Sequence, residues 1–133
     1  MGKLTVNVDG GSRGNPGPAA IGVVVRNDDG AIVEAVGETI GPQTNNVAEY
    51  RALIRGIELA LAHGADEVEL IGDSQLIVRQ VEGRYKVKHA AMKDLHAEAK
   101  KLLANFERWS IRDVRREQNA DADRLVNEAL DGA

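Results

Sequence analysis

The chain has 133 residues, which suits one domain with a single hydrophobic core over residues 1–133, and no low-complexity segment separates a second unit. It has no cysteine, which excludes disulfides, thiolate zinc sites and a cysteine nucleophile, and its start lacks the apolar run of a secretory signal, so we expect a cytoplasmic protein. The net charge of −4 argues against a protein that coats nucleic acid through a uniformly positive surface. Charged residues interrupt every apolar segment, so we expect no membrane span.

Three strands are predicted at the start of the chain. Residues 4–9 alternate apolar and polar side chains, with Val6 and Val8 on one face and Asp9 closing the strand on the polar face. Residues 21–26 and 31–40 are rich in Val and Ile, and an Asp-Gly step between them is a strong signal for a tight turn. The chain therefore opens as an antiparallel meander.

Helices and strands alternate in the rest of the chain. Apolar residues recur at helical spacing over residues 47–63, which places Glu49 in the first turn of a helix. A short strand over residues 68–71 runs into Gly72 and Asp73, and a helix follows it. The remaining elements are predicted as a helix over residues 74–81, a longer helix over 92–106, a fifth strand over 109–114 and a final helix over 122–130. This order predicts an α/β fold with a mixed sheet.

Four acidic residues fall at informative places in these elements. Asp9 and Asp73 close strands, Glu49 opens a helix, and the last helix carries an Asp-Ala-Asp sequence. In open α/β sheets, ligands collect beyond the carboxyl ends of the strands, where converged carboxylates would bind hard divalent cations. The pattern therefore indicates metal-assisted phosphate chemistry. In the last helix Asp121 and Asp123 lie on opposite flanks of the apolar stripe, and periodicity does not choose between them.

Two polar segments have both a structural and a functional interpretation. The glycine-rich residues 9–18 either form a tight turn or let the backbone approach a phosphate or sugar, although the segment lacks the Gly-Lys-Ser/Thr ending of a P-loop. Thr44, Asn45 and Asn46 precede a helix and suit helix capping. Three such side chains exceed what a cap needs, which favours hydrogen bonds to sugar hydroxyls and base edges.

Two further segments keep a structural alternative. Asp73 or Ser74 could cap the helix that follows and have no other role. Residues 84–93 are basic and include Tyr85, so they form either a solvated helix entrance or a strip that contacts nucleic acid through phosphate pairing and aromatic stacking.

Taken in order, four motifs resemble type 1 ribonuclease H over nearly the whole chain. They are Asp9-Gly-Gly-Ser-Arg-Gly-Asn-Pro-Gly-Pro, Thr44-Asn-Asn-Val-Ala-Glu49-Tyr, Asp73-Ser-Gln and Asn119-Ala-Asp-Ala-Asp123-Arg-Leu-Val-Asn. The resemblance implies a five-stranded mixed sheet, with three antiparallel strands followed by two parallel ones, flanked by helices. It also implies metal-dependent endonucleolytic hydrolysis of the RNA strand in RNA/DNA hybrids, with 5′-phosphate and 3′-hydroxyl ends.

The resemblance also implies the catalytic and metal-binding residues. The carboxylates carry over to Asp9, Glu49, Asp73 and Asp123, and Asp123 is preferred to Asp121 because a Leu-containing helical turn follows it. Two Mg²⁺ ions per site, with Mn²⁺ as a substitute, would activate a water, neutralise the scissile phosphate and stabilise the departing 3′-oxygen. The partner is an RNA/DNA hybrid, and a monomer is the simplest expectation.

Substrate contacts carry over in the same way. The strands of the hybrid would be contacted by Gly10, Gly11, Ser12, Asn15, Thr44, Asn45, Asn46, Gln75, Tyr85, Lys86 and Lys88. Asn15, Asn45 and Gln75 resemble minor-groove readers, and Ser12 with its glycines resembles the backbone contacts to the RNA strand. Recognition of 2′-hydroxyls would explain why RNA is cut and DNA is spared. Thr44 resembles a residue that seats a DNA phosphate, and the basic strip lies where the family grips DNA.

One position departs from many members of the family. An arginine stands where a mobile histidine precedes the last acid, as in a subset of the family, and we expect Arg116, or else Arg115, to hold the leaving phosphate or assist product release. Two alternatives stay open. They are a catalytically weak or silent hybrid-binding module, and another metal nuclease of the same superfamily, such as a junction resolvase or an integrase core.

Overall fold

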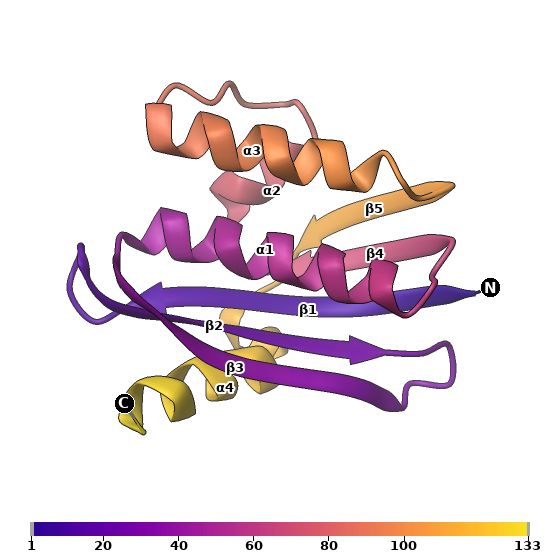
Figure 1. Ribbon diagram of the computed structural model, residues 1–133, viewed down its shortest axis with the longest axis horizontal. Coiled ribbons are helices and arrows are strands. Elements are labelled where there is room, and N and C mark those ends of the chain that lie inside the picture. The colour runs from indigo at the N-terminus through magenta and orange to yellow at the C-terminus, as the bar shows by residue number, and fades with distance from the viewer. Residues whose placement is uncertain (1, 133) are drawn as a thin grey trace.

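A five-stranded sheet forms the centre of the computed structural model, which describes residues 2–132 (Figure 1). The strands are β1 (Lys3–Ser12), β2 (Gly17–Arg26), β3 (Ile32–Gln43), β4 (Glu67–Gly72) and β5 (Arg108–Asp113), in the order β3-β2-β1-β4-β5. The pairs β1–β2 and β2–β3 are antiparallel, whereas β1–β4 and β4–β5 are parallel. The predicted mixed sheet, with three antiparallel and two parallel strands, is confirmed.

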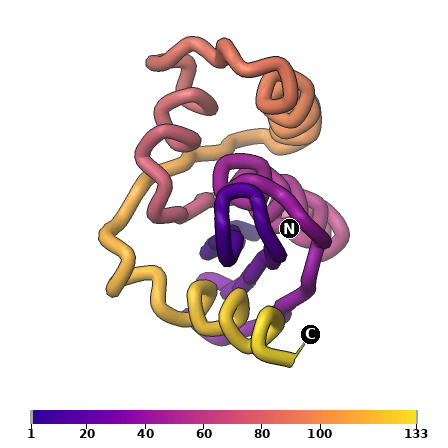
Figure 2. Tube along the Cα trace, turned by 90° about the vertical axis from the view of Figure 1, so that its left-hand side faces the viewer, coloured from indigo at the N-terminus to yellow at the C-terminus, as the bar shows by residue number. Residues whose placement is uncertain are grey.

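Helices cover both faces of the sheet. They are α1 (Asn45–Ala62), α2 (Gln75–Val81), α3 (Ala90–Leu103) and α4 (Ala120–Asp131), with a short 3₁₀ helix, η1 (Arg116–Asn119), directly before α4. The α1 helix packs on β1, α3 packs on α1, and α4 packs on β2 and β3 from the other face. Figure 2 shows α4 on the opposite side of the molecule from α2 and α3. No helix within residues 2–132 is long and apolar enough to cross a membrane.

The hydrophobic core lies mainly between the sheet and α1. Its largest fully buried side chains are Tyr50, Leu53, Ile57, Leu70 and Leu103. Residues 19–25 of β2 are all buried, because α1 and α4 cover that strand from both faces, and this explains its continuous run of small and β-branched residues. By contrast, β3 forms an edge of the sheet and exposes most of its side chains.

Some predicted boundaries are wrong, and two corrections bear on function. We expected β1 to end at Asp9, but it continues to Ser12, because the glycine-containing segment stays paired with residues 19–21 of β2. We expected Glu49 in the first turn of its helix, but α1 begins at Asn45, so Glu49 lies in the second turn. The Thr44 side chain sets this start by accepting a hydrogen bond from the backbone N–H of Val47.

Two glycines let both helices approach the sheet at backbone distance. A Cβ atom on Gly10 would lie 2.1 Å from the Ala48 carbonyl oxygen of α1, and one on Gly22 would lie 2.2 Å from the Ala122 carbonyl oxygen of α4. Any other residue would push the helix away. Gly22 is also the residue that pairs with Asp9 across the β1–β2 ladder. The main chains of α1, β1, β2 and α4 are therefore in direct contact around Asp9.

Candidate active site

Three acidic side chains converge at the carboxyl end of the parallel strands. One carboxylate oxygen from each of Asp9, Glu49 and Asp73 lies within 4.8 Å of the other two. The β1–β4 register pairs Asn7 with Ile71, so Asp9 and Asp73, each two residues further on, meet at the same edge. Glu49 reaches them from α1 because Gly10 lets that helix come close. The predicted convergence of these three acids is therefore present in the structure.

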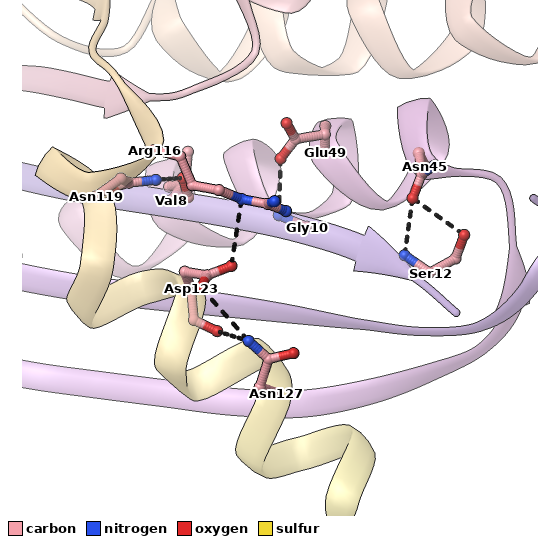
Figure 3. Close-up of polar contacts among 9 residues, drawn as sticks. All are labelled: Val8, Gly10, Ser12, Asn45, Glu49, Arg116, Asn119, Asp123 and Asn127. Carbon is pink, nitrogen blue, oxygen red and sulfur yellow. Dashed lines mark hydrogen bonds and ion pairs between the residues drawn. The ribbon is translucent and has the colours of Figure 1, made fainter. Parts of the chain in front are cut away.

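A backbone hydrogen bond fixes Glu49 at this site. The Gly10 N–H donates to Glu49 Oε1 over 2.7 Å (Figure 3). This bond aims the carboxylate along β1 towards Asp9, the residue that precedes Gly10. The same glycine thus provides both the room for α1 and the donor that orients its acid.

Burial and mutual repulsion raise the pKa of each of these acids. Asp9 is only 5% exposed, and desolvation, together with the charges of Asp73 and Asp123, raises its pKa to about 8, against the opposing effect of Arg116. Desolvation by burial, followed by the charges of Asp9 and Asp73, raises the pKa of Glu49 well above its usual range. Burial also raises the pKa of Asp73. Crowded carboxylates of this kind are stabilised by a cation.

The structure distinguishes between the two acids of the last helix. Asp123 faces the triad and interacts with the Asp9 carboxyl, whereas Asp121 points to the other flank, where its Oδ2 pairs with Arg26 Nη2 at 2.5 Å. Arg116 Nε lies 3.9 Å from Asp123 Oδ1 (Figure 3). Asp123 is therefore the fourth acid of the site, next to the triad, and Asp121 has a structural ion pair.

Asn119 fixes the junction between η1 and α4, a role that the sequence did not reveal. Its side chain is 1% exposed, and its Nδ2 donates to the Val8 carbonyl over 2.8 Å, while its Oδ1 accepts from Asn7 Nδ2 over 3.0 Å. Asn7 in turn accepts from Arg26. The only sequence signal for this role is that Asn119 is a polar residue just before the last helix, in the motif that contains Asp121 and Asp123. Through these bonds Asn119 positions the segment that carries Arg116 and Asp123.

A polar cleft of about 470 Å³ surrounds the acids. It is lined by Asp9, Gly10, Gly11, Ser12, Arg13, Asn45, Asn46, Glu49, Asp73, Val114, Arg115, Arg116, Asp123, Val126, Asn127 and Leu130. Of the proposed substrate contacts, the two glycines, Ser12, Asn45 and Asn46 thus lie beside the acids. The backbone N–H of Ser12 donates to Asn45 Oδ1 over 2.9 Å, and the backbone N–H of Asn45 donates to Asn15 Oδ1 over 3.0 Å. These bonds hold the β1–β2 loop against the start of α1.

The other predicted contact residues lie outside this cleft. Asn15 and Thr44 line a separate hollow of about 190 Å³, together with His89. Gln75 is the first residue of α2, where Ser74, not Asp73, is the capping residue. Gln75 is not among the described residues that line the cleft.

The basic strip lies in the connection between α2 and α3. Tyr85, Lys86 and Lys88 are exposed there, and the Arg79 guanidinium lies 5.7 Å from the centre of the Tyr85 ring. None of the three is among the described residues of the cleft. The strip therefore forms a surface of its own, apart from the acids.

Comparisons with known proteins identify the family. A family profile described as reverse transcriptase-like matches residues 7–129. The crystal structure of RNase H1 from Halobacterium salinarum superposes with a TM-score of 0.97 at 48% identity, covering 99% of this chain and all of that one. This chain belongs to the ribonuclease H family. The ribonuclease H domain at the amino terminus of a Mycobacterium tuberculosis protein superposes with a TM-score of 0.96 at 44% identity, covering 99% of this chain and 96% of that one.

A third ribonuclease H structure contains a nucleic acid. LC11-RNase H1, in complex with an RNA/DNA hybrid, superposes with a TM-score of 0.91 at 44% identity and covers 97% of both chains. In length, this ribonuclease H chain spans 66% of the curated ribonuclease HI of H. salinarum and 36% of the curated M. tuberculosis relative.

Proposed function

We propose that this chain is an endonuclease that hydrolyses the RNA strand of RNA/DNA hybrids and leaves 5′-phosphate and 3′-hydroxyl ends. The observation that carries the proposal is the convergence of Asp9, Glu49 and Asp73, with Asp123 beside them, in a polar cleft of a ribonuclease H fold. The LC11-RNase H1 complex with a hybrid supports the substrate class. A silent binding module would not need a cluster of mutually repelling acids, so the site favours an active enzyme.

The donor set fits Mg²⁺, with Mn²⁺ as a substitute. Both are hard cations that prefer carboxylate oxygens, and the triad offers three such oxygens within 4.8 Å of one another. Asp9, Glu49 and Asp73 would hold the metal, with Asp123 completing the site. When two ions are bound, they supply an activated water, charge neutralisation at the phosphate and stabilisation of the leaving 3′-oxygen.

The end of β1 and the start of α1 would bind the RNA strand. Asn45 Oδ1 already accepts from both the backbone N–H and the hydroxyl of Ser12, so its amide N–H groups are left to donate to a 2′-hydroxyl or a base edge. Gly10 and Gly11 both line the cleft. The space beside Gly10 is filled by α1, whereas the nearest atom to a Cβ on Gly11 would be 3.8 Å away, so Gly11 permits close approach of the sugar-phosphate chain. Asn46, inside the cleft, and Gln75, at the start of α2 and outside the cleft, complete these proposed contacts.

The DNA strand would lie across the remaining predicted contacts. Thr44 lines a hollow where it would help to seat a phosphate, and Asn15, the proposed minor-groove contact, lines the same hollow. The exposed Lys86 and Lys88 supply positive charge. Arg79 supports the ring of Tyr85 and would hold it in place for stacking. Separate surfaces for the two strands would account for a preference for hybrids.

Arg116 would assist the departure of the cleaved phosphate. It lines the cleft, is largely exposed, and pairs with Asp123 only at 3.9 Å, so its guanidinium has donors to spare for a phosphate. It also opposes the raised pKa of Asp9 and Asp73. An arginine stays protonated at neutral pH, so its role is to hold charge and not to shuttle a proton.

The decisive experiment is cleavage of an end-labelled RNA strand paired with DNA, with and without Mg²⁺, beside matched RNA and DNA duplexes. We expect metal-dependent cutting of the hybrid alone and no cutting by Asp73→Asn. The matched control is Asp121→Asn, which removes a carboxylate from α4 outside the cleft. A hybrid that is bound but stays intact with both Mg²⁺ and Mn²⁺ would overturn the proposal in favour of the silent module.

A further inference from the structure

One face of α4 forms a wall of the cleft from end to end. Asp123, Val126, Asn127 and Leu130 all line it, and their spacing of three, four and seven residues places them on the same side of the helix. At 1.5 Å per residue, the distance from Asp123 to Leu130 along the helix axis is about 10 Å. The cleft is therefore a track along α4 and not a single point.

An arginine stands at each end of this track. Arg116 lies beside Asp123 at the start of α4. At the other end Arg13 lines the cleft, and its Nη2 lies 2.7 Å from Oδ1 of Asp131, the last residue of the helix. This ion pair joins the carboxyl end of α4 to the connection between β1 and β2. Four acids occupy the region near Asp123, so Arg13 is the cation farthest from them along the track.

The backbone of Arg13 is held in place while its side chain remains accessible. Its backbone N–H donates to the Pro18 carbonyl over 2.8 Å, and the preceding Ser12 is bound to Asn45. The side chains of Arg13 and Asp131 are 49% and 67% exposed. An ion pair this exposed is weak and exchanges readily with another anion.

We propose that Arg13 binds a phosphate of the RNA strand two or three nucleotides from the cleavage point, and that Asp131 occupies the same guanidinium in the free protein. A track of about 10 Å covers about three phosphates of one strand, since successive charges on a strand advance about 3.4 Å along the axis. Phosphate accepts the planar fork of arginine in a bidentate manner, so it can displace a surface carboxylate. The inference rests on the proposed function, because that function places the RNA strand at the acids.

The two partners of the pair should have opposite effects on binding. Arg13→Ala removes one phosphate contact, so we expect affinity for the hybrid to fall about 5- to 10-fold and the slope of log affinity against log salt to become shallower by about one unit. Asp131→Asn removes the competitor, so we expect affinity to rise about 2- to 5-fold, the range that corresponds to a surface ion pair. Arg13→Lys should restore the salt slope and only part of the affinity.

The test is fluorescence anisotropy with a labelled RNA/DNA hybrid, titrated with protein carrying Asp73→Asn to prevent cleavage, at several NaCl concentrations. The matched control is the exposed pair of Arg55 and Glu38, which joins α1 to β3 outside the cleft. Arg55→Ala and Glu38→Gln should leave both affinity and salt slope unchanged. Thermal unfolding of every variant shows that it is folded, and Arg13→Gln replaces Arg13→Ala if the latter is not.

Two results would overturn the inference. One is an unchanged salt slope for Arg13→Ala. The other is weaker binding of the hybrid by Asp131→Asn, because if the pair had only a structural role, replacing either Arg13 or Asp131 would lower the affinity for the hybrid. These failures differ from failure of the proposed function, in which the unmodified protein would not cut the hybrid at all. If the unmodified protein cuts the hybrid and the Arg13 variants match it, only the role of Arg13 is lost.

Discussion

Replacing Asp9 with Asn should stabilise the protein in the absence of divalent cations, although it should abolish activity. The pKa of Asp9 rises from 3.8 to about 8 in the folded protein. A carboxyl with a raised folded-state pKa contributes full stability below its unfolded pKa and loses that contribution as the pH rises to the folded value. At 1.36 kcal/mol per pH unit, the loss for an isolated group between pH 3.8 and pH 7 would be about 4 kcal/mol.

The neighbouring acids share this cost, so we expect the single substitution to recover about half of it, on the order of 2 kcal/mol at pH 7. For a chain of this length, that corresponds to a rise in melting temperature of about 6–8 °C. Asn keeps the size of Asp and removes its charge, which limits other effects.

The assay is thermal unfolding by circular dichroism in EDTA, with the variant and the unmodified protein compared at acid, neutral and mildly alkaline pH. The gain should be small near pH 4 and grow up to about pH 8, and added Mg²⁺ should stabilise the unmodified protein more than the variant. Asp121→Asn is the control, and it should destabilise because it breaks the pair with Arg26. A gain that does not vary with pH, or a loss of stability at pH 8, would refute the electrostatic argument.

Three further outcomes follow from the site. Gly10→Ala should lower the free energy of unfolding by about 2–3 kcal/mol and should reduce cleavage activity to an even greater extent. The new Cβ would lie 2.1 Å from the Ala48 carbonyl oxygen and would force α1 away from β1. Chemical denaturation and the cleavage assay measure the two effects, and a fully active variant would contradict this reasoning. Asn119→Ala removes the hydrogen bonds to Val8 and Asn7, so it should lower turnover more than substrate affinity and raise the Mg²⁺ concentration needed for half-maximal rate. Unfolding is measured as a check, and an effect on stability alone would show that Asn119 has only a structural role. Arg116→Ala should slow turnover about tenfold or more, and Arg116→Lys should have a rate between those of Arg116→Ala and the unmodified protein. If both the single-turnover and the steady-state rates are unchanged, Arg116 has no part in the mechanism.

Much of the fold was predictable because the relevant signals are local. Period-two alternation predicts β1, and the ends of two predicted strands indicate Asp9 and Asp73 as acids at the carboxyl edge of the sheet, although β1 itself continues to Ser12. The start of α1 was misplaced because it depends on which of several polar residues before it acts as the cap, and the sequence offers more than one.

The site was less predictable where it depends on packing across the chain. Asp121 and Asp123 lie on opposite flanks of the apolar stripe, and the helical pattern does not show which flank faces the other acids. The ion pair between Asp121 and Arg26, 95 residues away in the sequence, distinguishes them. Asn119 looks like any polar residue before a helix until α4 docks and buries it against the carbonyl of Val8. Burial of this kind is set by tertiary contacts, so no local pattern could have revealed it.

The backbone contacts at Gly10 and Gly22 imply that the geometry of the site is insulated from the composition of the core. Three of the acids lie next to residues that form these contacts. Glu49 follows Ala48, and Asp123 follows Ala122. Asp9 precedes Gly10 in the chain and pairs with Gly22 across the β1–β2 ladder. Their separations are therefore set by main chain touching main chain. Conservative exchanges among the buried aliphatic side chains can change the stability of the protein while the acids keep their spacing. The core of this fold can therefore change in sequence while the active site keeps its chemistry.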